Sequence, residues 1–455
     1  MSTYNFIKKI NMKKIDDNHK SILPNITKIK NIEEEKCEEI LSDKSPKNNK
    51  ESHKKKKKKH NLYPYNFINN TNKNQIIENN EKSKIEKEIK KAEKKLRNLK
   101  LEDFEMENNL ERTLIFSNYR ADNIFISFTS IDNVLCLIYA EKKFDKYNSI
   151  VTYNIIDYKK INEIKNAHNE DISNFRHYLD KPRNRDLIIS ISAKDNNIRL
   201  WDINNLYFLL NITNINRIGF LKSACFLNYN NQIYIVSSNY SHSENADPIK
   251  IFDLTGSKVH EINCAKNNTF FIDVYYDEES SITFIITGNY GYIKSYDYNN
   301  KKKYHKYKEN KHIDHYEHHS AIIVKKDNIV KLIETSEKGE IRIWDFHNKE
   351  LLDKLKVSNN DYDNLYGMSL WNDDYLFVGC GNSIKLVDLN NREVLNGLVE
   401  HNHKIISVKT IIHPKYGECI ISLDIYDGQI KLWVNKINKY RYLISELNKK
   451  LNQYD

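Results

Sequence analysis

The sequence predicts an all-β fold, a β-propeller of seven blades, and three features of the chain support this prediction. An eight-residue pattern occurs seven times, its copies follow one another at a nearly constant interval, and apolar strand-like runs fill the intervals. Each interval has room for about four short strands, which is the content of one propeller blade. The segments before and after the repeats differ in composition and are predicted to lie outside the propeller.

The repeated pattern is predicted to be the third strand of each unit. A turn residue falls within its first two positions, isoleucine is third and a large apolar residue is sixth. We expect the isoleucine and the large apolar residue to lie on one face of the strand, where adjacent blades pack together. The copies are NSIVTYNI (148–155), NNIRLWDI (196–203), DPIKIFDL (247–254), GYIKSYDY (291–298), GEIRIWDF (339–346), NSIKLVDL (382–389) and GQIKLWVN (428–435). Their sixth residues, separated by 48, 51, 44, 48, 43 and 46 positions, are Tyr153, Trp201, Phe252, Tyr296, Trp344, Val387 and Trp433.

With this pattern the chain resembles the WD-repeat (WD40) family from about residue 113 to 435. Histidines precede some copies by about thirty residues, as in that family. The residues that carry the resemblance are the pairs Trp201-Asp202 and Trp344-Asp345, the variants Phe252-Asp253, Tyr296-Asp297 and Val387-Asp388, and the histidines His168 and either His401 or His403.

The resemblance implies a buried hydrogen-bonded set of His, Ser or Thr, Asp and Trp in each complete blade. Asp195 and Asp427 stand six residues before Trp201 and Trp433, and they match the family's turn aspartate. Other blades lack a member of the set, so we expect it to be complete in two blades. The aspartate that follows each large apolar residue is expected to brace the next turn. All of these residues are predicted to be structural, and no catalytic residue is assigned.

Charge divides the chain into a basic leader and a nearly neutral body. Residues 1–110 carry 27 basic and 18 acidic residues, whereas the rest carries 45 and 44. Residues 1–78 are rich in Lys, Asn and Ser and are predicted to be a disordered low-complexity segment. The six lysines from Lys54 to Lys59 are either a solvated run or a signal for nuclear import or RNA binding.

Two amphipathic helices are predicted to flank a propeller domain of residues 111–435. In the first, residues 79–110, apolar residues recur at spacings of three and four, with Lys and Glu between them. It is expected to dock on the main body, to pair with a partner helix as a coiled coil, or to remain a free surface helix. The second helix, residues 436–455, has one apolar face. The run TLIFSNY (113–119) is predicted to pair with residues 428–435 and to close the ring.

The cysteines and the amino terminus indicate an intracellular protein. Six cysteines lie far apart without a CxxC pair, so they are expected to be reduced and mostly buried. Neither a signal peptide nor a membrane-spanning run is predicted. The choice between cytoplasm and nucleus remains open.

Few stretches of the chain point to chemistry. Neither phosphate-binding glycine motifs nor HExxH occurs, and no cofactor or small-molecule substrate is predicted. The weak metal candidates are His312, His315, His318 and His319, which otherwise belong to a loop between blades.

Partner contacts are predicted in three loops. RHYLDKPRNRD is expected to join the first two strands of the second blade, where Arg183 and Arg185 could meet an acidic partner. An insertion at 237–248 in the third blade offers Tyr240 and His242, and the corresponding turn of the fourth blade offers Tyr290.

The function predicted from these features is a non-catalytic WD40-repeat scaffold that mediates protein–protein interactions in a multiprotein complex. The alternative is an RNA- or ribosome-associated processing factor that uses the basic tail. A metal-dependent enzyme at the histidine cluster is a further possibility.

Overall fold

A computed structural model describes residues 66–454 apart from 113–124, 143–147, 214, 216–220, 239–247, 264–268, 310–317, 327, 337–338, 361–364, 400 and 425–428. Most of the predicted disordered leader, with Lys54 to Lys59, therefore lies outside the described residues. Contacts divide the chain into two compact units, Met1–Lys84 and Ile85–Asp455. The strands all belong to the second unit.

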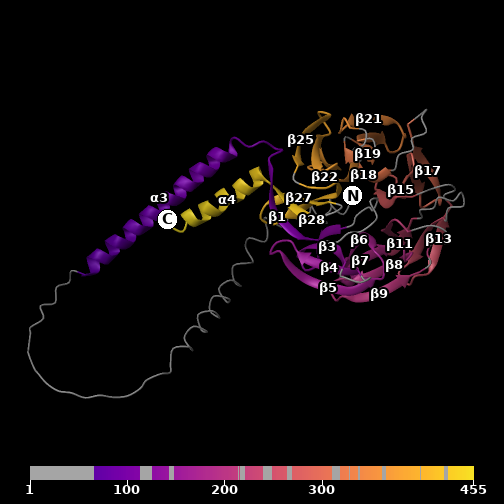
Figure 1. Cartoon of the computed structure of the whole chain (residues 1–455), viewed down its shortest axis with the longest axis horizontal. Coiled ribbons are helices and arrows are strands. Elements are labelled where there is room, and N and C mark those ends of the chain that lie inside the picture. Colours follow the sequence, from indigo (N-terminus) through magenta and orange to yellow (C-terminus); the bar gives the residue numbers. More distant parts are fainter. Residues whose placement is uncertain are drawn as a thin grey trace, which may run out of the picture. The chain divides into compact units, whose positions relative to one another are not determined.

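Seven four-stranded antiparallel sheets form a seven-bladed β-propeller, as the repeat predicts (Figure 1). In six of these sheets the strands follow one another in chain order, from the first, innermost strand to the fourth, outermost strand. Blade 1 consists of β2 (Phe125–Thr129), β3 (Leu135–Lys142), β4 (Asn148–Asn154) and β5 (Lys159–His168), and blade 2 of β6 (Ile172–Asp180), β7 (Arg185–Ser192), β8 (Asn197–Asp202) and β9 (Tyr207–Ile212). Blade 3 consists of β10 (Ala224–Tyr229), β11 (Gln232–Ser237), β12 (Ile249–Asp253) and β13 (Lys258–Ile262), and blade 4 of β14 (Phe271–Asp277), β15 (Ile282–Asn289), β16 (Tyr292–Asp297) and β17 (Lys302–Tyr307). Blade 5 consists of β18 (His318–Lys326), β19 (Ile329–Ser336), β20 (Glu340–Asp345) and β21 (Leu351–Lys356), and blade 6 of β22 (Leu365–Trp371), β23 (Tyr375–Cys380), β24 (Ser383–Asp388) and β25 (Glu393–Val399).

Blade 7 closes the ring with strands from both ends of the propeller sequence. Its sheet order is β1-β28-β27-β26, where β26 is Ile405–His413, β27 is Gly417–Asp424, β28 is Gln429–Asn435 and β1 is Phe104–Arg112. A closing strand is therefore present, but the prediction of residues 113–119 was wrong. β1 already occupies the outer edge of β28 in the register Phe104↔Asn435 to Arg112↔Gln429, and 113–119 lies outside the described residues.

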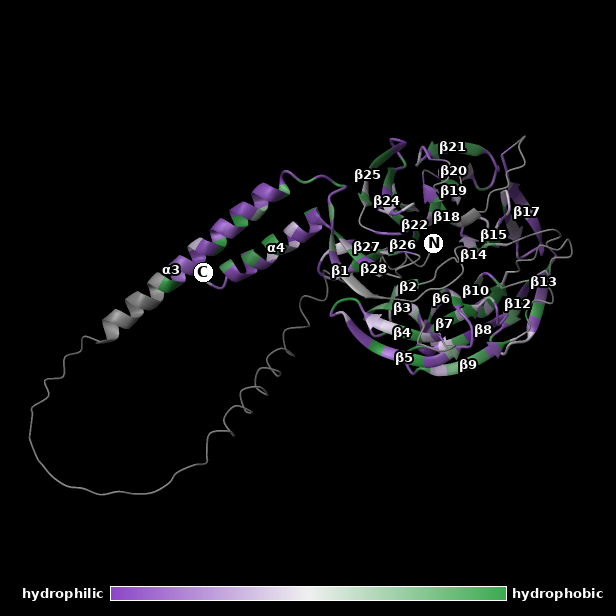
Figure 2. Ribbon diagram, in the orientation of Figure 1, coloured by the Kyte–Doolittle hydropathy of each residue, from purple (hydrophilic) through white to green (hydrophobic). Residues whose placement is uncertain are grey.

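Apolar side chains are buried between blades rather than in one central core. Seven clusters occur, one at each interface between neighbouring blades, including the interface between blades 7 and 1. Figure 2 shows apolar segments along the strands of the ring. Every blade thus shares its buried surface with two neighbours, which makes the ring a single packed body.

Each third strand packs against both neighbouring blades. This is contrary to the expectation that the isoleucine at the third position and the large apolar residue at the sixth share a face of the strand. Ile198 packs with blade 3, whereas Trp201 packs with blade 1. In blade 5, Ile341 packs toward blade 6 and Trp344 toward blade 4. The two positions are three residues apart, and side chains alternate every residue along a strand, so they point to opposite faces.

The flanking helices are α3 (Asn66–Leu96) and α4 (Lys436–Leu451). The predicted helix 79–110 ends at Leu96, because a turn braced by Lys100 N donating to Asp103 Oδ2 at 2.7 Å leads directly into β1. Asn435 caps α4 by accepting from the backbone N–H of Ile437 at 3.0 Å. Within the part of the chain that the structure covers, neither helix has an apolar stretch long enough to cross a bilayer.

The last turns of α3 contact α4. The ammonium group of Lys95 lies 5.7 Å from the ring centroid of Tyr440. Ile89 and Ala92 on α3 are buried, as is Leu447 on α4, whereas the charged residues between them are exposed. Residues 85–96 of α3 therefore dock within the second unit, where they contact α4.

Candidate functional site

Blade 2 contains the hydrogen-bonded set that the resemblance implies. The hydroxyl of Ser190 lies 2.8 Å from Nε1 of Trp201 and 2.7 Å from Nε2 of His168. An indole N–H can only donate, so Ser190 accepts from Trp201, and its hydroxyl shares a second hydrogen bond with Nε2 of His168. Nδ1 of the imidazole faces Asp195 Oδ2 at 3.9 Å. Burial, followed by the charge of Arg199, lowers the pKa of His168 to about 3, so the ring is neutral.

Blade 7 repeats this set with a different acid. Ser422 Oγ lies 2.8 Å from Nε1 of Trp433 and 2.7 Å from Nε2 of His401. Nδ1 of His401 contacts Asp424 Oδ2 at 3.0 Å. The predicted Asp427 lies outside the described residues, and sequence spacing did not indicate Asp424. The choice between His401 and His403 is thereby decided in favour of His401.

Blade 5 uses a buried carboxylate instead of a serine. Trp344 donates its indole N–H to Oε1 of Glu334 at 2.8 Å. Arg342, on the same third strand, lies 3.9 Å from that oxygen and 3.4 Å from Glu309. Burying a carboxylate requires a compensating charge, and Arg342 supplies it.

The aspartates at the ends of the third strands brace the turns that follow, as the sequence predicts. Each accepts at least one backbone N–H hydrogen bond from the next few residues, at 2.8–3.2 Å. These residues are Asp202, Asp253, Asp297, Asp345 and Asp388. The large apolar residues Phe252, Tyr296 and Val387 are buried, and Tyr153 stacks on Tyr139 with centroids 5.8 Å apart.

A second position of the repeat is also structural, and the sequence analysis did not predict it. The fourth residue of the pattern is Arg or Lys in six copies. Arg199 donates to the carbonyl of Ala167, and Lys250 donates to that of Ile215. Each acceptor lies in the segment that leads into the blade from its neighbour. The repeated cation at this position was the signal that could have revealed these contacts.

The two arginines predicted to bind a partner form ion pairs within their own turn. Arg183 and Arg185 both contact buried Asp180, at 3.3 Å and 2.7 Å. The turn joins the first two strands of blade 2, as predicted. Tyr290 is 42% exposed and lies beside Phe270, with ring centroids 6.4 Å apart. Tyr240 and His242 lie outside the described residues.

The histidine cluster is only partly covered by the structure. His312 and His315 lie outside the described residues, and His318 and His319 are part of β18, where their backbone alone is described. Among the described residues, no group of three or more metal-ligating side chains converges.

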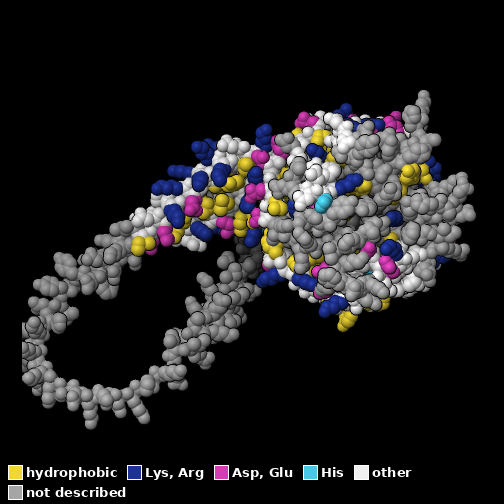
Figure 3. All heavy atoms as spheres, in the orientation of Figure 1, with side chains coloured by type: hydrophobic (Ala, Val, Ile, Leu, Met, Phe, Trp, Pro, Cys, Tyr) yellow, Lys and Arg dark blue, Asp and Glu magenta, His cyan; other side chains and the backbone are white. Residues whose placement is uncertain are grey.

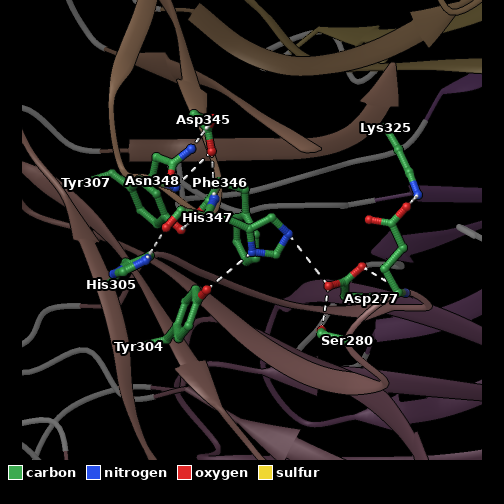
Figure 4. Close-up of polar contacts among 11 residues, drawn as sticks. Asp277, Ser280, Tyr304, His305, Tyr307, Lys325, Asp345, Phe346, His347 and Asn348 are labelled. Atoms are coloured by element: carbon green, nitrogen blue, oxygen red, sulfur yellow. Dashed lines mark hydrogen bonds and ion pairs between the residues drawn. The ribbon is translucent and has the colours of Figure 1, made fainter. Parts of the chain in front are cut away.

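A cluster that the sequence did not indicate joins blades 4 and 5 (Figure 4). Asp277 ends β14, Tyr304 and His305 lie on β17, and His347 follows β20. Nε2 of His347 lies 3.6 Å from Asp277 Oδ2, and Nδ1 of His347 lies 3.3 Å from the hydroxyl of Tyr304. His305 Nε2 lies 2.6 Å from the carbonyl oxygen of His347. Both side chains of β17 therefore fix the position of a residue from the next blade.

The pKa shifts in this cluster favour a structural contact between the two blades over a nucleophilic site. Burial raises the pKa of Tyr304, and neighbouring carboxylates, Asp277 first among them, raise it further. The phenol therefore stays protonated at neutral pH, and its hydroxyl shares a hydrogen bond with Nδ1 of His347. Burial would raise the pKa of Asp277, but a hydrogen bond from the Ser280 hydroxyl and other donors lower it overall.

The outer strand β9 is chemically unlike the other outer strands. Tyr207, Phe208 and Leu209, here called the apolar rim, are 66%, 53% and 39% exposed. β9 carries no charged residue, whereas each of the other six outer strands carries at least one. On the coloured part of the face in Figure 3, basic and acidic side chains are interspersed.

The seven closed sheets define the class of this protein as a seven-bladed β-propeller, with a Trp–Ser–His set in blades 2 and 7. No protein-family model matches the chain, and no curated protein matches it. Among solved structures, it is similar to the β-propeller domain of Cps50 (Swd1) from Myceliophteria thermophila. The TM-score is 0.54 at 10% identity, over 73% of this chain and 99% of that one. At this identity the likeness shows the fold.

Proposed function

We propose that this protein is a non-catalytic scaffold that binds partner proteins within a multiprotein complex. The observation that carries the proposal is the apolar rim of blade 2. Propeller sheets end in an outer strand whose second edge is open, and proteins normally protect such edges with charged residues. β9 lacks that protection.

The apolar rim fits an extended segment of a partner protein. Within the described residues, β9 pairs only with β8, so backbone groups on its outer edge are available to a further strand. A partner strand with apolar side chains would bury Tyr207 and Leu209 and pair with this edge. Aromatic side chains at the centre of such a contact contribute most of its binding energy.

The proposal is tested by placing a charge on the rim. In cells that express the tagged full-length chain, Leu209→Lys is expected to remove the proteins that photo-crosslink to position 207 in the unaltered chain. Val394→Lys on the outer strand β25 is the matched control, because Val394 is also exposed. If both variants keep the same crosslinked partners, or both lose them, the apolar rim is not the docking surface.

The alternative function is RNA binding by the basic tail, and most of this tail lies outside the residues that the structure describes. It remains a prediction, and salt titration of RNA binding with and without residues 1–78 tests it.

A further inference from the structure

Lysines from two strands of blade 4 converge around one tyrosine. Lys294 on β16 lies directly opposite Lys306 on β17 in the strand register. Their ammonium nitrogens lie 5.1 Å and 3.9 Å from the ring centroid of Tyr292. Lys303 on β17 and Lys308 just after it extend the positive charge, and we call these five residues the lysine surface.

Like charges directly opposite each other destabilise an antiparallel pair, so this arrangement costs the sheet stability. Burial lowers the pKa of Lys306, and the charges of Lys308 and Lys303 lower it further. The cation–π contacts with Tyr292 offset part of this repulsion. An anion placed beside Lys306 would relieve its repulsion from Lys303 and Lys308.

The carboxylate of Glu309, which follows Lys308 in the chain, is engaged elsewhere. It lies 3.4 Å from Arg342 and 3.3 Å from Lys354 of blade 5. Within the described part of the chain, no ion pair forms at Lys303, Lys306 or Lys308, and all three side chains are exposed. Lys303, Lys306 and Lys308 therefore have positive charge available for a partner.

We propose that the lysine surface binds an extended acidic segment of a partner protein along the outer edge of β17. Lys306 and Lys308 are two positions apart. An irregularity in the pairing sets Lys303 and Lys306 opposite Tyr296 and Lys294, which are themselves two positions apart on β16. Alternate residues of a strand are about 6.6 to 6.8 Å apart, so carboxylates at every second position of a partner strand match these three lysines. This surface is on blade 4 and is separate from the apolar rim of blade 2. It goes beyond the scaffold function by stating the chemistry of a second partner.

The geometry favours an acidic peptide over single-stranded nucleic acid. Nucleic acid binding without sequence preference combines cations with open aromatic faces on which bases stack. The ring of Tyr292 is covered by the Lys306 ammonium at 3.9 Å, so it offers no such face. Carboxylates need only the amines.

Residue-resolved acetylation of lysines tests the proposal on the full chain. The probe is a synthetic decapeptide of alternating Glu and Thr, and mass spectrometry follows the acetylation rate of each lysine. We expect the peptide to slow acetylation of Lys303, Lys306 and Lys308 about tenfold at low salt, with the protection lost as salt rises. Lys159, an exposed lysine on the outer strand β5, is expected to react unchanged.

Substitution and a competing probe make the outcome decisive. Lys306→Glu is expected to abolish protection of Lys303 and Lys308, whereas Lys159→Glu leaves it intact. Because each lysine is followed separately, binding at the basic leader does not obscure the result. The proposal is overturned if these lysines are not protected, if Lys159 is protected equally, or if a single-stranded RNA decamer protects them as strongly as the peptide.

Discussion

A single serine hydroxyl satisfies two buried groups in each complete blade. Ser190 accepts from an indole and hydrogen-bonds an imidazole, and Ser422 does the same in blade 7. The second nitrogen of each imidazole faces an aspartate. In blade 2, burial keeps His168 neutral, which links the stability of the propeller to pH.

His168 is expected to make the protein less stable as pH falls. Its pKa is about 3 in the folded chain and 6.5 in the unfolded chain, so the unfolded state binds a proton first. The stabilisation is complete above pH 6.5 and is lost progressively as pH falls toward 3. Between pH 6.5 and 5 the loss amounts to about 2 kcal/mol.

Urea unfolding of the unaltered chain and of His168→Gln at a series of pH values measures this effect. The variant is expected to start less stable but to lose about 2 kcal/mol less over this interval. Parallel stability curves for the unaltered chain and His168→Gln would contradict the explanation.

At the scale of elements, the ring is closed by β1 and not by the segment that follows it. Phe104, near the start of β1, is 8% exposed and contacts Trp371 and Phe377 of blade 6 at centroid distances of 5.5 and 5.4 Å. Met106, two residues along the same strand, is 40% exposed. β1 thus forms the outer strand of blade 7 and also contacts blade 6.

Substitution on this strand measures how strongly β1 closes the ring. Phe104→Ala is expected to lower the free energy of unfolding by about 3 kcal/mol, because it removes a buried ring and leaves a cavity. Met106→Ala, on the same strand with the same backbone pairing, is expected to cost less than about 1 kcal/mol. Equal losses in urea unfolding would show that the contacts of Phe104 do not close the ring.

The packing of blades 6 and 7 shows how closely elements approach. A Cβ at Gly367, which has φ of +57°, would lie 2.8 Å from Cα of Ser407 on the next blade. Only glycine permits both this backbone conformation and this distance. Two inner strands therefore come close enough for Ser369 and Thr410 to hydrogen-bond at 2.8 Å.

At the scale of the whole molecule, the propeller is one cooperative body with distinct surfaces. Each of the seven apolar clusters is shared by two blades, and the last one joins blade 7 to blade 1. Losing one blade would expose apolar surface on two others. The apolar rim and the lysine surface therefore belong to one rigid ring and sit on different blades.

This architecture is expected to unfold in a single transition. The four tryptophans lie in blades 2, 5, 6 and 7, so their fluorescence reports on separate parts of the ring. Urea curves from fluorescence and from far-ultraviolet circular dichroism should coincide. Two separated transitions would show that groups of blades unfold independently.

The sequence predicted features that depend on neighbours along the chain. The number of blades, the third strand of each blade and the aspartates that brace its turn follow from patterns eight residues long. His168 and Trp201 were also identified, because the family spacing brings them together. The faces of the third strand were assigned wrongly, since an interval of three positions was taken to preserve the face.

What the sequence determined by itself was the repeating unit, because alternating apolar residues and turn residues act within one strand. Only the tertiary structure decided which strand closes the ring, which aspartate meets His401, and that lysines on β16 and β17 surround Tyr292. It also showed that the uncharged β9 is exposed rather than covered. These properties depend on the register between strands and on which segment packs beside another, and residues distant in the sequence decide both.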